Sequence, residues 1–108
     1  MKTLVLILLG ASVAFSVNAA DPAKGQKKAA EVCVACHGAD GTKPSAPDQP
    51  ILAGQYNDYL VQALTDYKVG RRTNPIMKGF ASGLSKQDIE DLAAWFSSQK
   101  TTTLHNQR

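Results

Sequence analysis

The chain has 108 residues, enough for one domain, with 12 basic and 9 acidic side chains and a formal net charge of +3. Residues 1–20 contain one charged residue, Lys2, so the chain from residue 21 onward has 11 basic and 9 acidic side chains, a net charge of +2. Because this balance is near neutral and no basic run is interleaved with aromatic residues, we do not expect the protein to bind nucleic acid.

Residues 1–20 have the order of a secretory signal peptide. Lys2 gives a positive start, a dense run of leucine, valine and isoleucine follows, and Ala19 and Ala20 end the segment with small residues. We expect cleavage after Ala19 or Ala20 and export of residues 21–108 to the periplasm, with no membrane span left after cleavage. An uncleaved anchor is the alternative, but the apolar run is short for a span and small polar residues interrupt it.

A first helix is expected to start at Asp21 and Pro22. An aspartate side chain accepts hydrogen bonds from free N–H groups at a helix start, and proline suits the first helical position. The segment from Ala23 to Val34 is rich in helix formers and runs directly into two cysteines. Gly25 weakens this helix by roughly 1 kcal/mol relative to alanine. Its presence indicates that another element approaches the backbone closely.

Residues 38–50 hold three prolines and two glycines and no apolar period, and they predict a loop. A second helix should follow, because apolar residues recur at spacings of three and four and Gly70 offers a stop. That stripe consists of Tyr56, Tyr59, Leu60, Ala63, Leu64 and Tyr67. Residues 71–83 are expected to be irregular, since Pro75 disfavours helix at Asn74.

The third helix has the clearest pattern. Ser85 is a good N-cap, and Asp88 three residues later nearly completes a capping box. The inward stripe consists of Ile89, Leu92, Ala93 and Phe96. The polar residues 101–108 are expected to form a flexible tail. No strand pattern competes, so the sequence predicts an all-α domain of three to four short helices. Their apolar surface is too small to order two long loops, which implies a large buried apolar group.

Cys33, Cys36 and His37 have the spacing of a covalent haem attachment site. Two thiols three residues apart on a helical turn lie on one face and can reach both vinyl groups of one porphyrin. The next residue, His37, can then bring its imidazole under the iron as an axial ligand. Haem attachment takes place outside the cytoplasm, which agrees with the predicted signal peptide.

Three other interpretations of the cysteines are weaker. A structural zinc site needs four ligands, and the only fourth candidate, His105, is badly spaced in the polar tail. A thioredoxin-like redox pair requires a βαβ context that an all-helical chain lacks. A simple disulfide between Cys33 and Cys36 leaves His37 and the two loops without explanation.

Met77 is the only methionine after residue 20 and is the candidate second axial ligand. A lone methionine usually fills a gap in a core. Next to a haem motif, however, a rigid loop containing Pro75 can direct the thioether sulfur to the face opposite His37. His105 is the rival ligand. A His/Met pair fills both axial positions and raises the reduction potential, which suits a carrier of single electrons.

The chain resembles a single-haem class I cytochrome c, and in particular one half of the di-haem periplasmic cytochromes of the c4 type. The similarity covers residues 21–108, although only one haem motif is present. Gly25 stands where the family keeps a small residue against its C-terminal helix, and Leu92 and Trp95 match the residues that cross it. The resemblance implies the class I cytochrome c fold, with long loops wrapped around one covalent haem c.

Two further segments carry this resemblance. Residues 50–55, Pro-Ile-Leu-Ala-Gly-Gln, are similar to a family segment whose proline carbonyl accepts a hydrogen bond from the ligand histidine. This implies such a bond from His37 to Pro50, which would fix the ring, and a place for Leu52 against the haem. Residues 70–77 look like the c4 segment before the methionine ligand, which implies that Arg72 approaches a haem propionate.

The resulting hypothesis is a soluble, monomeric periplasmic electron carrier that is not an enzyme. Its expected partners are a donor of the quinol–cytochrome c reductase type and a terminal oxidase or reductase as acceptor. The first alternative is a haem c subunit bound tightly to a periplasmic dehydrogenase. The second is a haem sensor or peroxidase in which Met77 is displaced from the iron.

Overall fold

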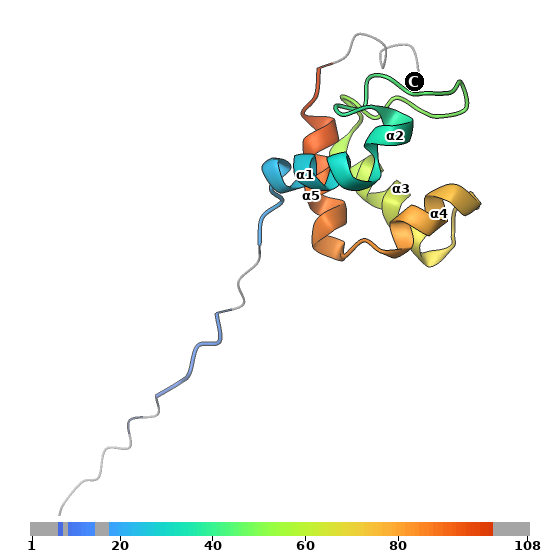
Figure 1. The fold of residues 1–108 in the computed structure, drawn as a ribbon. Helices are drawn as coiled ribbons and strands as arrows, with labels where there is room; N and C mark the ends of the chain where they lie inside the picture. The colour runs from blue at the N-terminus through green and yellow to red at the C-terminus, as the bar shows by residue number, and fades with distance from the viewer. Residues whose placement is uncertain (1–6, 8, 15–17, 101–108) are drawn as a thin grey trace, which may run out of the picture.

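The computed structural model describes residues 7, 9–14 and 18–100, and within them it contains five helices and no strand (Figure 1). The helices are α1 (Pro22–Val32), α2 (Val34–His37), α3 (Asn57–Val69), α4 (Pro75–Ser82) and α5 (Lys86–Ser97). The predicted all-α fold class is confirmed. The described part of the chain has more helices than the three or four expected.

Helix α1 begins as the sequence predicts. The Asp21 side chain accepts hydrogen bonds from the backbone N–H groups of Ala23 and Lys24, at 2.9 and 3.4 Å, and Pro22 occupies the first helical position. The helix ends earlier than expected, at Val32, because Cys33 adopts φ −112°. The four-residue helix α2 then follows as a separate turn.

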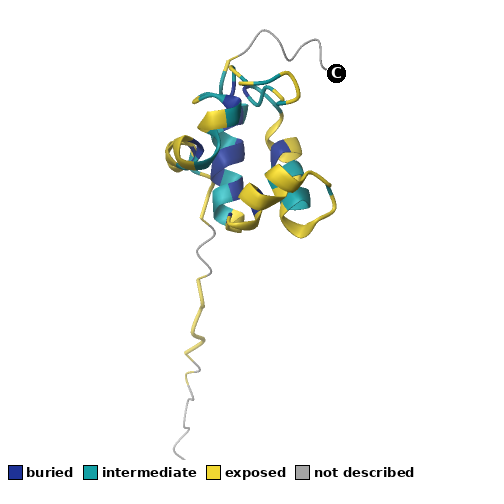
Figure 2. Ribbon diagram, turned by 45° about the vertical axis from the view of Figure 1, so that its right-hand side comes forward, coloured by how far each residue is buried: buried dark blue, intermediate teal, exposed yellow. Residues whose placement is uncertain are grey.

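Helices α1 and α5 pack against each other at Gly25. A Cβ atom built on Gly25 would lie 2.0 Å from the carbonyl oxygen of Asp91 and 2.9 Å from the Cβ of Trp95. The close approach predicted from this glycine is therefore present. Buried residues gather along α5 (Figure 2), where the predicted stripe is buried in full. Its members are Ile89, Leu92, Ala93 and Phe96.

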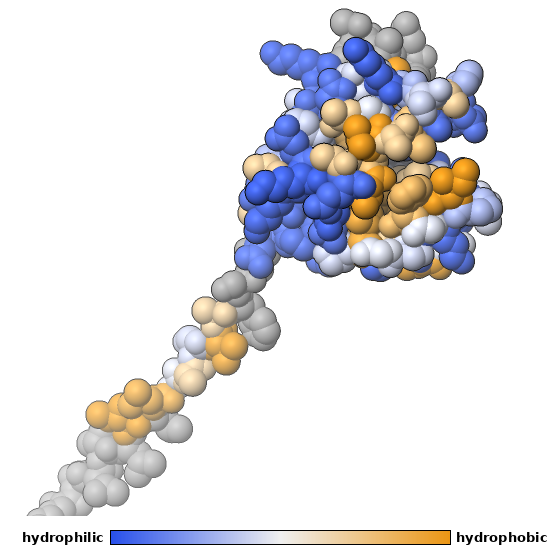
Figure 3. Space-filling model, viewed as in Figure 1, coloured by the Kyte–Doolittle hydropathy of each residue, from blue (hydrophilic) through white to orange (hydrophobic). Residues whose placement is uncertain are grey.

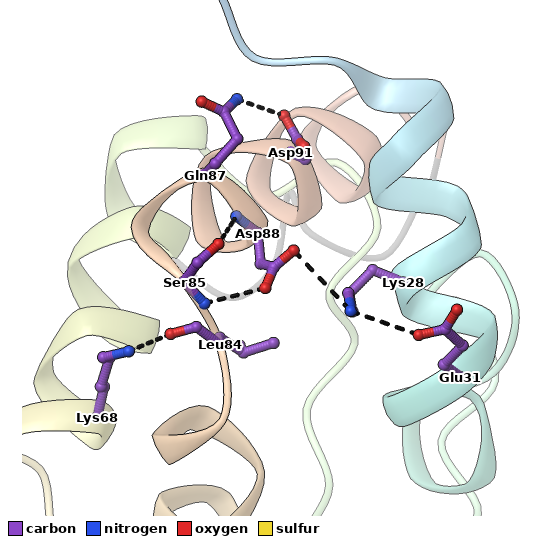
Figure 4. A network of polar contacts seen from close by, with 8 residues as sticks. All are labelled: Lys28, Glu31, Lys68, Leu84, Ser85, Gln87, Asp88 and Asp91. Atoms are coloured by element: carbon purple, nitrogen blue, oxygen red, sulfur yellow. Dashed lines mark hydrogen bonds and ion pairs between the residues drawn. The ribbon is translucent and has the colours of Figure 1, made fainter. Parts of the chain in front are cut away.

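Helix α3 ends at Gly70, whose φ of 87° is a left-handed conformation that glycine adopts without steric cost. Near this end Lys68 donates a hydrogen bond from Nζ to the carbonyl oxygen of Leu84, which ties α3 to the start of α5 (Figure 4). The apolar stripe predicted for α3 is only partly buried. Leu60 is buried, whereas Tyr56 and Tyr59 at the N-terminal end of α3 are exposed.

The expectation that residues 71–83 are irregular is wrong, because Pro75–Ser82 form helix α4. Asn74 is extended at φ −146°, as the residue before a proline should be, and Pro75 then occupies the first helical position. The Asn74 side chain accepts hydrogen bonds from the N–H groups of Ile76 and Met77, both at 3.1 Å. The proline thus starts a helix at a position where the sequence suggested that it prevents one.

Helix α5 opens with a complete capping box (Figure 4). The Ser85 hydroxyl accepts from the Asp88 N–H at 3.0 Å, and the Asp88 carboxylate accepts from the Ser85 N–H at 2.9 Å. Lys28 on α1 lies 3.9 Å from the same carboxylate. The box therefore begins α5 and also links it to α1.

The loop between α2 and α3 is held by contacts with the helices. Trp95 on α5 donates its indole N–H to the carbonyl oxygen of Ala39 at 3.2 Å, and the Gly54 N–H donates to the carbonyl oxygen of Phe96 at 2.8 Å. Within the loop the Leu52 N–H donates to the carbonyl oxygen of Gly41 at 2.9 Å. These bonds fold the loop back over the C-terminal half of α5.

Residues 7, 9–14 and 18–20 are exposed and contain no helix or strand, and the segment extends away from the helices (Figure 1). None of the helices in the described ranges has the length and apolar character needed to cross a membrane. The predicted flexible tail, residues 101–108, lies outside the described residues, and so does His105.

Candidate haem site

The two cysteines of the motif are free thiols in the structure. Cys33 lies at the break between α1 and α2, where it packs against the hydrophobic core, and Cys36 lies on α2. Burial, together with the neighbouring Cys36, raises the pKa of Cys33 to about 11. The Cys33 thiol is therefore neutral at pH 7, as suits a group at the margin of an apolar core.

His37 is buried at the end of α2, and its Nδ1 lies 2.8 Å from the carbonyl oxygen of Pro50. A carbonyl oxygen can only accept a hydrogen bond, so Nδ1 carries the hydrogen and donates it. The second nitrogen, Nε2, then keeps its lone pair. This arrangement leaves one ring atom of a fixed imidazole ready to bind a metal ion.

The loop that carries Pro50 is set by a tight turn at Gly41. Gly41 has φ +78°, and a Cβ built there would lie 2.8 Å from a ring carbon of Phe96 and 2.9 Å from the backbone nitrogen of Ala53. Only glycine combines this backbone conformation with so little space. Leu52 lies later in the same loop, where it is half-buried and packs against the core that contains Phe96.

Met77 lies in the first turn of α4 and its side chain is only partly buried. It does not belong to the buried hydrophobic cluster of the core. Its backbone N–H is held by the Asn74 side chain at 3.1 Å, so the direction of the Met77 side chain is set by how α4 begins. Helix α4 packs against α3, and this packing fixes the position of the backbone at Met77.

Arg72 places its guanidinium carbon 4.7 Å from the centre of the Tyr67 ring. This is a cation–π contact, and it leaves the edge of the guanidinium available to hydrogen-bond an anion. Arg72 also lines a cavity of about 240 Å³ between the end of α3 and the start of α4. Lys78 lines the same cavity, whereas the neighbouring Arg71 is bonded to Asp66 at 2.7 Å.

Large apolar side chains of α3 and α4 are left exposed on this part of the molecule. The exposed fractions are 50% for Tyr59, 67% for Ile76 and 46% for Phe80, and Val34 on α2 is also exposed. Figure 3 shows apolar side chains gathered on the face that carries α2 and α4. A chain this small does not usually leave so much apolar surface without a ligand or partner.

These features fit a covalently attached haem. The buried imidazole offers one nitrogen ligand, the thioether of Met77 offers a sulfur ligand, and the two free thiols have the sequence spacing of a haem attachment site. The exposed apolar side chains supply a surface that a macrocycle would cover. In contrast, no three His, Cys, Asp or Glu side chains within the described ranges gather as a metal site would require.

Two residues near the site were not assigned a role from the sequence. Asn74 caps α4 and holds the N–H of Met77, and the Asn-Pro pair at 74–75 is a signal that could have revealed it. The guanidinium of Arg72 stacks over the ring of Tyr67, and no local sequence pattern indicates that contact. Both act through the residues they position.

Comparison with known proteins gives a consistent result. A model of the cytochrome c family matches residues 22–100. The cytochrome c4 of Pseudomonas aeruginosa is 51% identical over 100 residues, covering 92% of this chain and 49% of the relative. The thiosulfate dehydrogenase electron acceptor of Stutzerimonas stutzeri strain A1501 is 35% identical over 102 residues, covering 87% of this chain and 47% of the relative.

The fold has solved counterparts as well. The crystal structure of reduced recombinant cytochrome c4 from Pseudomonas stutzeri matches with a TM-score of 0.69 at 47% identity, covering 76% of this chain and 47% of that one. The chain thus spans about half the length of the relatives it matches.

Proposed function

The chain belongs to the cytochrome c family and carries haem c, and on this basis we propose that it is an exported carrier of single electrons. The observation that carries the proposal is the bond from His37 Nδ1 to the Pro50 carbonyl oxygen, at 2.8 Å. It prepares Nε2 of a buried ring as a ligand, in the residue that directly follows Cys36.

The roles of the individual residues follow from their chemistry. Cys33 and Cys36 would hold the group through two thioether links. His37 would bind the iron through Nε2, and its hydrogen bond to Pro50 prevents the ring from rotating. Met77 would supply a sulfur ligand. When bound, haem c supplies a one-electron couple of ferric and ferrous iron.

The residues around the group set how it exchanges electrons. The neutral thioether of Met77 favours ferrous iron over ferric iron and raises the reduction potential. Leu52 would line the group and limit access of water, and Arg72 would hydrogen-bond a propionate through the free edge of its guanidinium. With His37 and Met77 both bound to the iron, no position would be open to a substrate, so we propose a carrier rather than an enzyme.

Spectroscopy of the exported protein tests this proposal. The intact mass should exceed that of the chain by one haem, and the oxidised protein should show the weak near-infrared band of a sulfur-to-iron bond. Met77→Ala should remove this band, while Ile76→Ala, the neighbouring change on α4, should retain it. Haem attachment without the band would sink the His37/Met77 assignment and favour a sensor or peroxidase.

We propose the periplasm as the location, with a quinol–cytochrome c reductase type of donor and a terminal oxidase or reductase as acceptor. The predicted cleavage beside Ala20 supports export. A free carrier should be a monomer whose reaction with a partner slows as salt is added, because its docking depends on exposed charges. Size-exclusion chromatography of the periplasmic fraction distinguishes it from a subunit that elutes with a larger enzyme.

A second candidate is electron acceptance from a sulfur-oxidising dehydrogenase. The relative from Stutzerimonas stutzeri that is named as a thiosulfate dehydrogenase electron acceptor favours it. Stopped-flow reduction of the oxidised protein by such a dehydrogenase and thiosulfate tests this partner. Reduction as slow as with thiosulfate alone would exclude that partner and leave the carrier role intact.

A further inference from the structure

Asp91 is a buried carboxylate on the face of α5 that packs against α1. Its side chain is 4% exposed. Its Oδ1 accepts two hydrogen bonds, from the backbone nitrogen of Asp21 at 2.7 Å and from Nε2 of Gln87 at 2.9 Å. Figure 4 shows the Gln87 contact, which comes from the preceding turn of the same helix. The contact from Asp21 spans 70 residues of sequence.

No cationic side chain of the described ranges lies within 4.0 Å of the Asp91 carboxylate; the ion pairs of α1 and α5 involve Lys28 and Lys86 with other acids. Asp91 also lies in the second turn of α5, beyond the first turn where the helix dipole favours a negative charge. A buried carboxylate needs compensation from charge as well as from hydrogen bonds. In the uncleaved chain its compensation comes from hydrogen bonds alone.

We propose that removal of the signal peptide beside Ala20 creates the missing counter-ion, because the new α-ammonium group forms at the atom that already contacts Asp91. This inference rests on the proposed export. Hydrolysis of the bond between Ala20 and Asp21 by a signal peptidase adds one water molecule. The carboxylate leaves with residue 20, and the freed amine of Asp21 takes up a proton at neutral pH.

The position of the junction supports this step. Residues 18–20 are exposed, so a peptidase can reach them, yet Asp21 is already fixed against α5. After hydrolysis at this bond the ammonium nitrogen is the atom 2.7 Å from Asp91 Oδ1. Hydrolysis after Ala19 instead leaves the Asp21 nitrogen a peptide amide, so the pairing requires cleavage between Ala20 and Asp21.

A positive charge at the N-terminus of α1 is itself unfavourable unless a negative group lies close to it. The N-terminal end of a helix carries partial positive charge and repels an ammonium group. Two carboxylates surround this end, since Asp21 caps the helix with its side chain and Asp91 contacts its nitrogen. The processed terminus is thereby drawn to α5, directly beside the crossing of α1 and α5 at Gly25. Export processing thus strengthens the main helix–helix contact of the domain.

The first measurement is the N-terminal sequence and intact mass of the haem-loaded protein exported with its own leader. We expect the chain to begin at Asp21. A retained leader, or a start at another residue, would overturn the inference without touching haem attachment, which the same mass reports. Failure of this inference and failure of the proposed function are therefore distinguishable.

The second measurement is a double-mutant cycle on haem-loaded protein. The mature chain is compared with a chain in which four neutral residues precede Asp21, so that its nitrogen is again a peptide amide. In the mature chain Asp91→Asn should raise the equilibrium constant of unfolding about tenfold more than in the extended chain, which is what one hydrogen bond between charged groups contributes. An equal effect in both chains would refute the pairing.

Asp88→Asn is the matched control in this cycle. Asp88 lies on the same helix, but its partners are Ser85 and Lys28 rather than the terminus of α1. Its replacement should change the unfolding equilibrium by the same factor in the mature and extended chains. A difference confined to Asp91 assigns the coupling to the new terminus.

Discussion

Gly25 on α1 lies so close to Asp91 on α5 that a methyl group on its Cα would meet the Asp91 carbonyl oxygen at 2.0 Å. The oxygen belongs to the backbone, so a side chain rotation cannot relieve the contact. The two helices can accommodate any larger residue only by moving apart. This single contact therefore limits how closely α1 and α5 can pack.

Gly25→Ala should consequently destabilise the protein, by about 2 kcal/mol, the middle of the range for overpacked sites. The gain in helix propensity, about 1 kcal/mol, is smaller than this cost. Gly79→Ala on α4 is the matched control, because a Cβ there has no atom within 4 Å. That change should leave stability equal or raise it. Denaturant unfolding checks both, and equal stability of the two variants would contradict the close contact.

Met77→Ala should lower the reduction potential, because loss of the thioether removes a ligand that favours ferrous iron. It should also open one axial position to added ligands such as imidazole. Redox titration and ligand binding followed by absorbance measure both effects. An unchanged potential would show that Met77 does not bind the iron.

Asn74→Ala should weaken the start of α4 by about 1 kcal/mol, since the side chain holds the N–H groups of Ile76 and Met77. The sulfur-to-iron band should then disappear at a lower temperature than in the parent protein. Ser85→Ala removes the corresponding cap of α5 and should cost a similar free energy. If Ser85→Ala and Asn74→Ala affected the band equally, a local role of Asn74 would be ruled out.

Arg72→Gln should lower the reduction potential, because removing a positive charge near the iron favours the ferric form. It should also cost about 0.5–1 kcal/mol of stability through loss of the contact with Tyr67. Arg71→Gln is the matched change, since Arg71 is bonded to Asp66 instead. Potentials that shift by the same amount in the two variants would argue against a specific contact of Arg72 with a propionate.

The protein should lose stability in acid. The Ser85 backbone N–H holds the pKa of Asp88 below its usual value, and the Ser85 hydroxyl, Lys28 and Lys68 add to this. A lowered folded-state pKa contributes stability above the unfolded pKa of about 3.9, and this stability is lost as the pH falls through the folded pKa. Asp88→Asn should therefore flatten the decline in the free energy of unfolding below about pH 4.

The exposed loop residue Asp48 provides the control for this pH dependence. Asp48→Asn should retain the decline seen in the parent protein. Thermal unfolding followed by far-ultraviolet circular dichroism across this pH range provides the measurement. A slope that is identical in the parent and in Asp88→Asn would contradict the role of the capping box.

Helix α4, which was not predicted from the sequence, shows where local patterns are insufficient. Pro75 made residues 71–83 look irregular, yet Asn74 and Pro75 are together a helix start. The pair was interpreted through the restriction that proline places on the residue before it, and that restriction holds at Asn74. Whether the following eight residues form a helix depends on packing against α3, which a short window does not contain.

Structural features that depend only on residues close together in the sequence could be predicted from the sequence alone. The starts of α1 and α5, the end of α3 at Gly70 and the spacing of the two cysteines with His37 depend on contacts across at most four residues. The bond between His37 and the Pro50 carbonyl, 13 positions away, was implied by the family resemblance and by no local pattern, and only the tertiary structure decided that Asp91 meets Asp21 70 positions away. Such pairs form because the packing of α1 on α5 and the folded loop bring distant backbones together, and no local periodicity records that packing.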